Sequence, residues 1–141
     1  MTPDKIALVK SSFAEVAKIA EPAAGLFYGR LFEVAPSVQH LFKGDLTAQG
    51  RKLMAALAMV VGSLDRMDQI LPQVEHMARR HVAYGAEEAH YAVVGDTLIW
   101  TLEQGLGDAF TPAVRQAWAE AYAALSGAMI AAARTVEAPA A

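Results

Sequence analysis

Cysteine is absent from the 141 residues of this chain. Its absence excludes disulfide bonds, thiolate nucleophiles, and zinc or iron–sulfur sites held by cysteine. Long hydrophobic runs are missing as well, because the longest uncharged stretches are 53–64 and 121–133. Both stretches fall well short of the roughly 20 residues that a membrane-spanning helix needs. We therefore expect no membrane partner.

Positive charge is scarce and scattered. The 12 Lys and Arg residues face 15 Asp and Glu residues, which leaves a net charge of -3. Such a chain lacks the basic stripe with which proteins meet phosphate backbones, so we expect no nucleic-acid partner. The beginning of the sequence shows no basic segment followed by an apolar one, and we expect a cytoplasmic protein.

Helical periodicity runs through the chain, and no long alternation of apolar and polar residues indicates a strand. Thr2 and Thr111 suit helix N-caps, and several prolines and glycines suit helix openings and ends. These are Pro22, Pro36, Pro72 and Pro112, and Gly85, Gly105 and Gly107. We predict one all-α domain over residues 1–141, with a frayed tail from about residue 135. The predicted helices are 3–20, 22–35, 36–42, 47–64, 71–83, 88–106 and 112–134.

His81 falls on the apolar stripe of the predicted helix 71–83, in register with Val74, Met77 and Ala78. We expect its imidazole to point inward, where burial is costly unless a partner binds the ring. A lone inward histidine is more often a core residue that is hydrogen-bonded to a carbonyl or hydroxyl. Two other inward stripes, however, carry polar groups as well.

Tyr28 and Gln49 lie on the inward faces of the predicted helices 22–35 and 47–64. A buried tyrosine needs one partner, whereas a glutamine brings two donors and a double acceptor. The two groups either satisfy each other or a water, or they face a ligand. Three polar groups that converge on an apolar interior favour a ligand site.

Four runs of the sequence resemble the globins: GLFYGRLFEVAPSVQHLF, AQGRKLM, MARRHVAYG and HYAVVGDTL. The resemblance is closest to bacterial haemoglobins, the haem domains of flavohaemoglobins, and neuroglobin-like single-domain globins, and it covers about residues 4–133. It implies a globin fold of six to eight helices that holds haem b, which is iron protoporphyrin IX. It also places Ala24 and Gly50 where two helices touch most closely.

The resemblance implies a role for most candidate residues. His81 would be the proximal ligand of the iron, and Tyr28 and Gln49 would stabilise a diatomic ligand on the opposite side. Gln49 stands where neuroglobin has a histidine, which predicts a sixth iron position that is open or holds water. The remaining histidines, His40, His76 and His90, fit surface positions better.

Other residues would surround the haem. Phe42 resembles the phenylalanine that packs on the porphyrin, Leu53 the apolar residue that crowds the ligand, and Val94 an apolar haem contact; each also suits an ordinary core position. Two cations, Lys52 and Arg80, either pair with the haem propionates or serve as solvated surface charges.

Tyr91 resembles the tyrosine that contacts the proximal histidine of flavohaemoglobins. Those proteins add a glutamate near the end of the last helix, where this chain has Ala133. Glu137 lies one turn further, and we expect it to be too far into the tail. Strong peroxidase-like chemistry is therefore not expected.

Three functions follow from the resemblance. The first is binding of O₂, NO or CO by ferrous haem, for oxygen storage or transport or for NO scavenging. The second is a nitric oxide dioxygenase that turns over with a separate reductase, since 141 residues leave no room for a reductase domain. The third is a gas sensor or interaction module. We expect a monomer or a weak homodimer.

Overall fold

The computed structural model describes residues 1–42 and 44–137 of the chain. This part is helical and contains no strand, which confirms the predicted all-α class. The α-helices are α1 (Pro3–Ala17), α2 (Ala20–Val34), α3 (Leu46–Gly62), α4 (Leu71–Ala83), α5 (Glu88–Leu106) and α6 (Pro112–Glu137). The 3-10 segments are η1 (Pro36–Leu41), η2 (Leu64–Ile70) and η3 (Gly107–Ala109).

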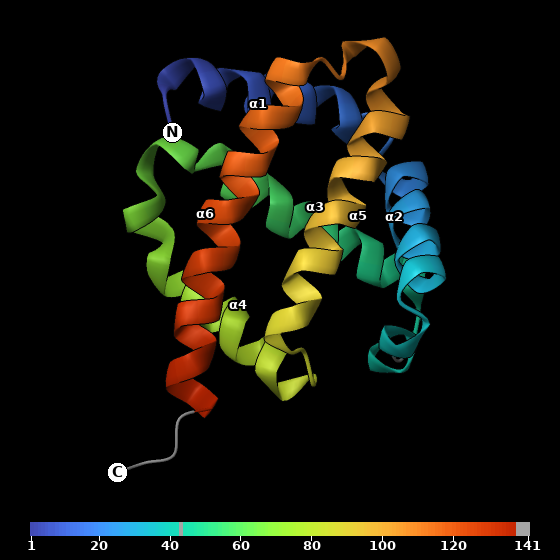
Figure 1. The fold of residues 1–141 in the computed structure, drawn as a ribbon, viewed down its shortest axis with the longest axis vertical. Helices are drawn as coiled ribbons and strands as arrows, with labels where there is room; N and C mark the ends of the chain where they lie inside the picture. The colour runs from blue at the N-terminus through green and yellow to red at the C-terminus, as the bar shows by residue number, and fades with distance from the viewer. Residues whose placement is uncertain (43, 138–141) are drawn as a thin grey trace.

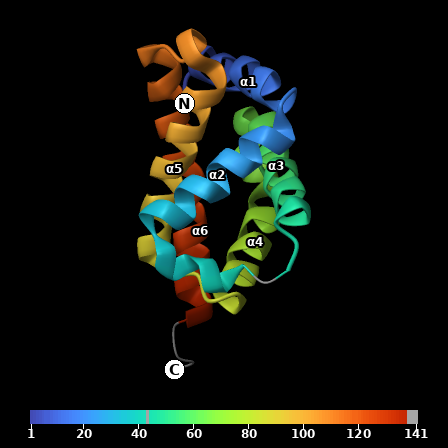
Figure 2. The same ribbon diagram turned by 90° about the vertical axis from the view of Figure 1, so that its right-hand side faces the viewer.

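The helices pack around a shared apolar core. α5 and α6 run side by side, with α3 and α4 behind them and α1 across one end (Figure 1). α2 crosses beside α5 and against α3 (Figure 2). Leu31 and Leu102 are among the largest fully buried side chains of this core, whereas Val74, Ala78 and Met129 form a second cluster between α4 and α6. Each cluster joins helices that lie far apart in the sequence.

Local chemistry sets several helix ends as predicted. The Thr2 hydroxyl accepts from the Lys5 amide at 3.3 Å and caps α1. Thr111 does the same for the first turn of α6, accepting from the Val114 amide at 3.2 Å. Gly85 follows α4 with a φ of +96°, a backbone conformation that favours glycine.

Some boundaries differ from the prediction. α1 ends at Ala17, and α2 begins at Ala20 with Pro22 inside its first turn, where the missing amide costs nothing. The predicted helix 36–42 is the 3-10 segment η1. Residues 64–70 form η2, where the prediction has mostly a connection, because Arg66 leaves helical geometry and prevents a continuous α-helix into α4.

α6 extends beyond its predicted end. It continues as helix to Glu137, three residues past the predicted end at 134, whereas residues 138–141 lie outside the described part. The frayed tail stays a prediction. No helix within 1–42 and 44–137 combines the length and the apolar character needed to cross a bilayer.

Candidate functional site

Tyr28 is the buried polar residue of α2. Its side chain is 5% exposed, and its ring packs edge-on against Phe27 and Phe42, with centroid separations of 5.1 and 5.3 Å. Its hydroxyl lies 3.5 Å from the backbone carbonyl oxygen of Gln49, at the long limit of a hydrogen bond. Burial raises the pKa of Tyr28, and hydrogen bonding with Gln49 opposes this in part. The phenol therefore remains a protonated donor at neutral pH.

α3 brings Gln49 and Leu53 to the same region. Both side chains are half-buried, and Leu53 follows Gln49 by about one helical turn. α2 and α3 meet closely here, since a Cβ atom on Gly50 of α3 would lie 2.8 Å from the Cβ atom of Ala24 on α2. The predicted helix contact at Ala24 and Gly50 is confirmed, and it places Gln49 beside Tyr28.

Phe42 follows η1 and joins this region to the end of α4. Its half-buried ring packs against Tyr28 and also against Phe32, at a centroid separation of 5.5 Å. The preceding residue, Leu41, contacts the corner after α4: a Cβ atom on Gly85 would lie 3.1 Å from the Leu41 Cδ2 atom. The corner after α4 therefore packs against the end of η1, next to the aromatic contacts of Tyr28.

His81 stands in the last turn of α4, and its Nδ1 atom lies 2.7 Å from the backbone carbonyl oxygen of Met77. A carbonyl accepts and cannot donate, so Nδ1 carries the proton and the neutral ring keeps a lone pair on Nε2. This tautomer is the one in which a histidine ligates a metal through Nε2.

The side chain of His81 is exposed, whereas its place on the apolar stripe predicts burial. Its orientation toward a ligand stays a prediction. The helix ends only two residues later, at Ala83, so the inward stripe runs out at the corner. The imidazole lies beside the exposed ring of Tyr84, at a centroid separation of 6.4 Å. The ring is therefore accessible to a ligand.

Lys52 and Arg80 are both exposed and share a second property. Neither has an ion pair, whereas every other lysine and arginine in the described part of the chain has one. Their neighbours Arg51 and Arg79 each pair with a glutamate, at 3.5 Å. Lys52 and Arg80 are thus free to meet an anionic group.

α5 carries Tyr91 and Val94, which are both half-buried. Val94 packs against the main core and Tyr91 against the second cluster. The Tyr122 hydroxyl of α6 donates to the Tyr91 carbonyl oxygen at 2.6 Å, and its ring lies where a Cβ atom on Gly95 would come within 2.6 Å. Tyr122 therefore positions the backbone of Tyr91. The expected contact between Tyr91 and His81 stays a prediction.

The remaining expectations have mixed outcomes. His40 and His76 are exposed as predicted, but His90 is half-buried and helps to cap α5. Ala133 is buried, with 5% of its surface exposed. The side chain of Glu137 lies outside the described part of the chain, so the expectation about it stays a prediction.

The pattern of residues and the helix order have a match among known families. The family model described as Globin matches residues 25–129. The chain belongs to the globin family. Membership of this family implies a haem cofactor and small gas ligands.

Similar curated proteins are named flavohemoproteins. This globin is 32% identical to the flavohemoprotein of Bordetella parapertussis over 144 aligned positions. The alignment covers 100% of this chain and 36% of the relative. The chain is 31% identical to that of Bacillus subtilis, with 89% of this chain and 32% of the relative covered. The chain spans about a third of the length of these relatives.

Two solved structures share the fold. A bacterial globin from Campylobacter jejuni superposes with a TM-score of 0.85 at 24% identity, and the match covers 96% of this chain and 98% of the other. An engineered carbene transferase, built on a proposed nitric oxide dioxygenase of Rhodothermus marinus, has a TM-score of 0.86 at 27% identity and covers 96% of this chain and 95% of its own. The predicted globin fold is confirmed.

Proposed function

We propose that this globin holds haem b through His81 and binds O₂, NO or CO on the side of Tyr28 and Gln49, for oxygen storage and transport or for NO scavenging in the cytoplasm. One observation carries the proposal. The exposed imidazole of His81 is held by the Met77 carbonyl in the tautomer whose Nε2 lone pair is free for iron.

The surrounding residues fit a haem by their chemistry. Phe42, Leu53 and Val94 are half-buried apolar groups that suit the porphyrin ring. Lys52 and Arg80 are exposed cations that have no ion pair with the residues the structure describes, and they suit the two propionates. When bound, the haem would supply a ferrous iron that takes a diatomic ligand.

Tyr28 and Gln49 would determine how tightly that ligand is held. The Tyr28 hydroxyl has a long hydrogen bond at 3.5 Å, so its donor is only weakly engaged by the protein. In a buried, apolar setting a donor of this kind contributes more than it would in water. The side-chain amide of Gln49 would add a second donor.

The test uses the 141-residue chain with added haem. We expect the wild-type protein to take up one haem and to give a five-coordinate ferrous spectrum that changes on addition of O₂ or CO. His81→Ala should lose the haem or hold it weakly, while His76→Ala removes an exposed histidine of the same helix and should behave as wild type. Normal haem spectra for His81→Ala would contradict the proposal.

A nitric oxide dioxygenase is the second candidate function. It is favoured by the similarity to flavohemoproteins and to the Rhodothermus marinus protein. In this reaction NO, O₂ and one electron give nitrate, and the electron comes from a separate reductase. Many nitrate molecules formed per protein when a flavin reductase and NADH are added would support this function. Only one nitrate formed per protein molecule under the same conditions would contradict this function and favour gas binding alone.

A further inference from the structure

The corner between α4 and α5 folds back onto the helix end that carries His81. The Ala86 amide donates to the backbone carbonyl oxygen of His81 at 2.9 Å, and the Gly85 amide donates to that of Val82 at 3.0 Å. Gly85 also packs closely against Leu41 of η1. The backbone of His81 is thus linked directly to the conformation of the corner.

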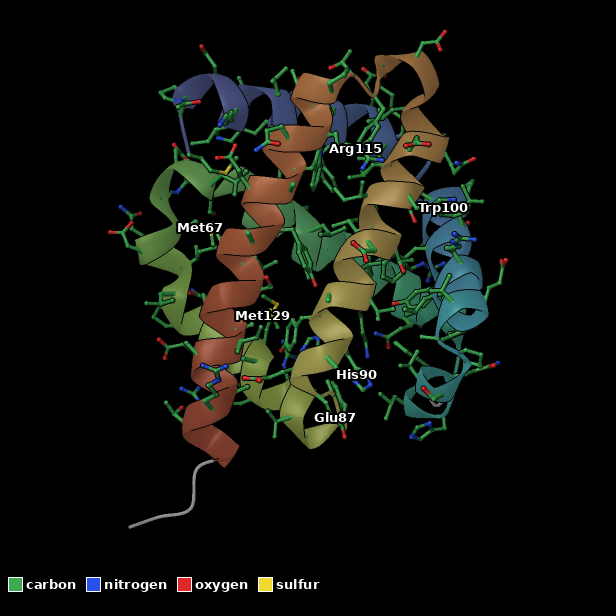
Figure 3. All side chains as sticks on the ribbon, viewed as in Figure 1. Met67, Glu87, His90, Trp100, Arg115 and Met129 are labelled. Carbon is green, nitrogen blue, oxygen red and sulfur yellow. The ribbon has the colours of Figure 1, made fainter. Side chains whose placement is uncertain are left out.

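The other end of this corner is closed by a reciprocal cap at the start of α5, where Glu87 and His90 lie (Figure 3). The His90 backbone amide donates to the Glu87 carbonyl oxygen at 3.0 Å, and the His90 Nδ1 atom accepts from the Glu87 amide at 2.9 Å. The usual acceptor at this position of a capping box is Glu or Gln. Here it is an imidazole, which takes up a proton in a range that those side chains do not.

A proton on Nδ1 abolishes this acceptor. Histidine is the side chain type whose ordinary pKa lies between pH 5 and 8, and both ring nitrogens of a protonated imidazole are donors. The protonated ring would face the Glu87 N–H, also a donor, and would place positive charge at a helix N-terminus, where it is unfavourable. The charged groups at this helix start are the carboxylates of Glu87 and Glu88, and Arg134 of α6 pairs with Glu88.

We propose that His90 makes the α4–α5 corner acid-sensitive, so that its protonation loosens the cap at Glu87 and weakens the positioning of His81. The first half of the proposal concerns the corner alone. The second half, in which the hold on the haem weakens with acid, rests on the proposed function.

The experiment compares wild-type protein with His90→Gln, which keeps a capping-box acceptor that does not titrate, and with His76→Gln, which removes an exposed histidine. Amide hydrogen exchange at Glu87, corrected for the intrinsic effect of pH, reports on the corner. In wild type and His76→Gln the protection of this amide should fall about fivefold between pH 7.5 and 5.5, the effect of one hydrogen bond. In His90→Gln the protection should stay constant. A further variant, His90→Ala, should show low protection throughout this range.

The second readout is the rate at which haem passes to excess apomyoglobin. Between pH 7.5 and 5.5 this rate should rise about fivefold more in wild type and His76→Gln than in His90→Gln. Constant protection at Glu87 in wild type, or an equal fall in His90→Gln, would overturn the acid-sensitive corner. Equal haem loss in all three proteins would overturn the link to His81. If none of them binds haem, the proposed function and that link both fail, while the exchange at Glu87 still decides the first half.

Discussion

At the scale of single residues, Tyr28 and Tyr122 show how the length of one hydrogen bond separates two roles. The Tyr122 hydroxyl donates at 2.6 Å to a backbone carbonyl, which engages its donor fully. The Tyr28 side chain is buried, but its hydroxyl lies 3.5 Å from its acceptor. A long bond releases its donor at little cost. Tyr28 is therefore suited to meet a ligand, whereas Tyr122 supports the structure.

Replacement of Tyr28 by Phe tests this distinction. The ring contacts with Phe27 and Phe42 are kept, so the fold should persist, but the donor is lost. We expect O₂ to dissociate about ten- to a hundredfold faster, the range for a hydrogen bond to a charged or strongly polar group. Stopped-flow replacement of O₂ by CO measures this rate. Tyr84→Phe makes the same chemical change at an exposed ring and should leave the rate unaltered. Equal rates in Tyr28→Phe and wild type would rule out the donor role.

The sequence predicts the burial of Tyr28 correctly but not the exposure of His81, for a physical reason. Helical periodicity shows which side of a helix a residue occupies, and Tyr28 lies in a part of α2 that other helices cover. Periodicity does not show where a helix ends, and α4 ends two residues after His81. The cap formed by His90 escapes prediction because imidazole is not among the usual capping-box residues.

At the scale of elements, the crossing of α2 and α3 holds Tyr28 and Gln49 together. Ala24 and Gly50 allow this approach because neither carries atoms beyond Cβ, and a Cβ atom on Gly50 would be only 2.8 Å from that of Ala24. Prolines and glycines predict most helix boundaries to within a few residues. The 3-10 segments are harder to predict because they are too short to show a period, as residues 64–70 illustrate.

Gly50→Ala should therefore push α3 away from α2. We expect the free energy of unfolding to fall by about 1–3 kcal/mol, as in other overpacked cores, and O₂ to dissociate faster because Gln49 moves away from Tyr28. Urea unfolding and stopped-flow kinetics check the two effects. Gly25→Ala on α2 adds its methyl group to open space and should raise stability by up to about 1 kcal/mol.

A compensating change sharpens this prediction. Ala24→Gly removes the methyl group that the Gly50→Ala substitution would strike, so the double variant should be more stable than the sum of the two single changes implies. Urea unfolding of the two single variants and the double variant measures the difference. Purely additive effects would show that the two helices do not meet through these residues.

At the scale of the whole molecule, Tyr28 and Tyr122 make the free energy of unfolding depend on alkaline pH. Burial raises the pKa of Tyr122, and the nearby Tyr91 and Asp96 raise it further; burial also raises the pKa of Tyr28. Above the ordinary tyrosine pKa of about 10, the unfolded chain releases protons that the folded chain still holds. The stabilisation is thus complete below about pH 10 and is lost as the pH rises toward the folded pKa values.

We expect the free energy of unfolding of the wild-type protein to fall above pH 10, with Tyr28 and Tyr122 each contributing up to about 1.4 kcal/mol per pH unit. Tyr122→Phe should start about 1 kcal/mol lower at pH 8, since the Tyr91 carbonyl loses its donor, but its stability should then decline less steeply. Urea unfolding at intervals from pH 8 to 11 measures both quantities. The exposed Tyr84 provides the control, because Tyr84→Phe should keep the wild-type slope. If all three proteins lose stability at the same rate, the alkaline transition arises from groups other than Tyr122, and the enclosure of its hydroxyl between α5 and α6 does not control the pH limit of the fold.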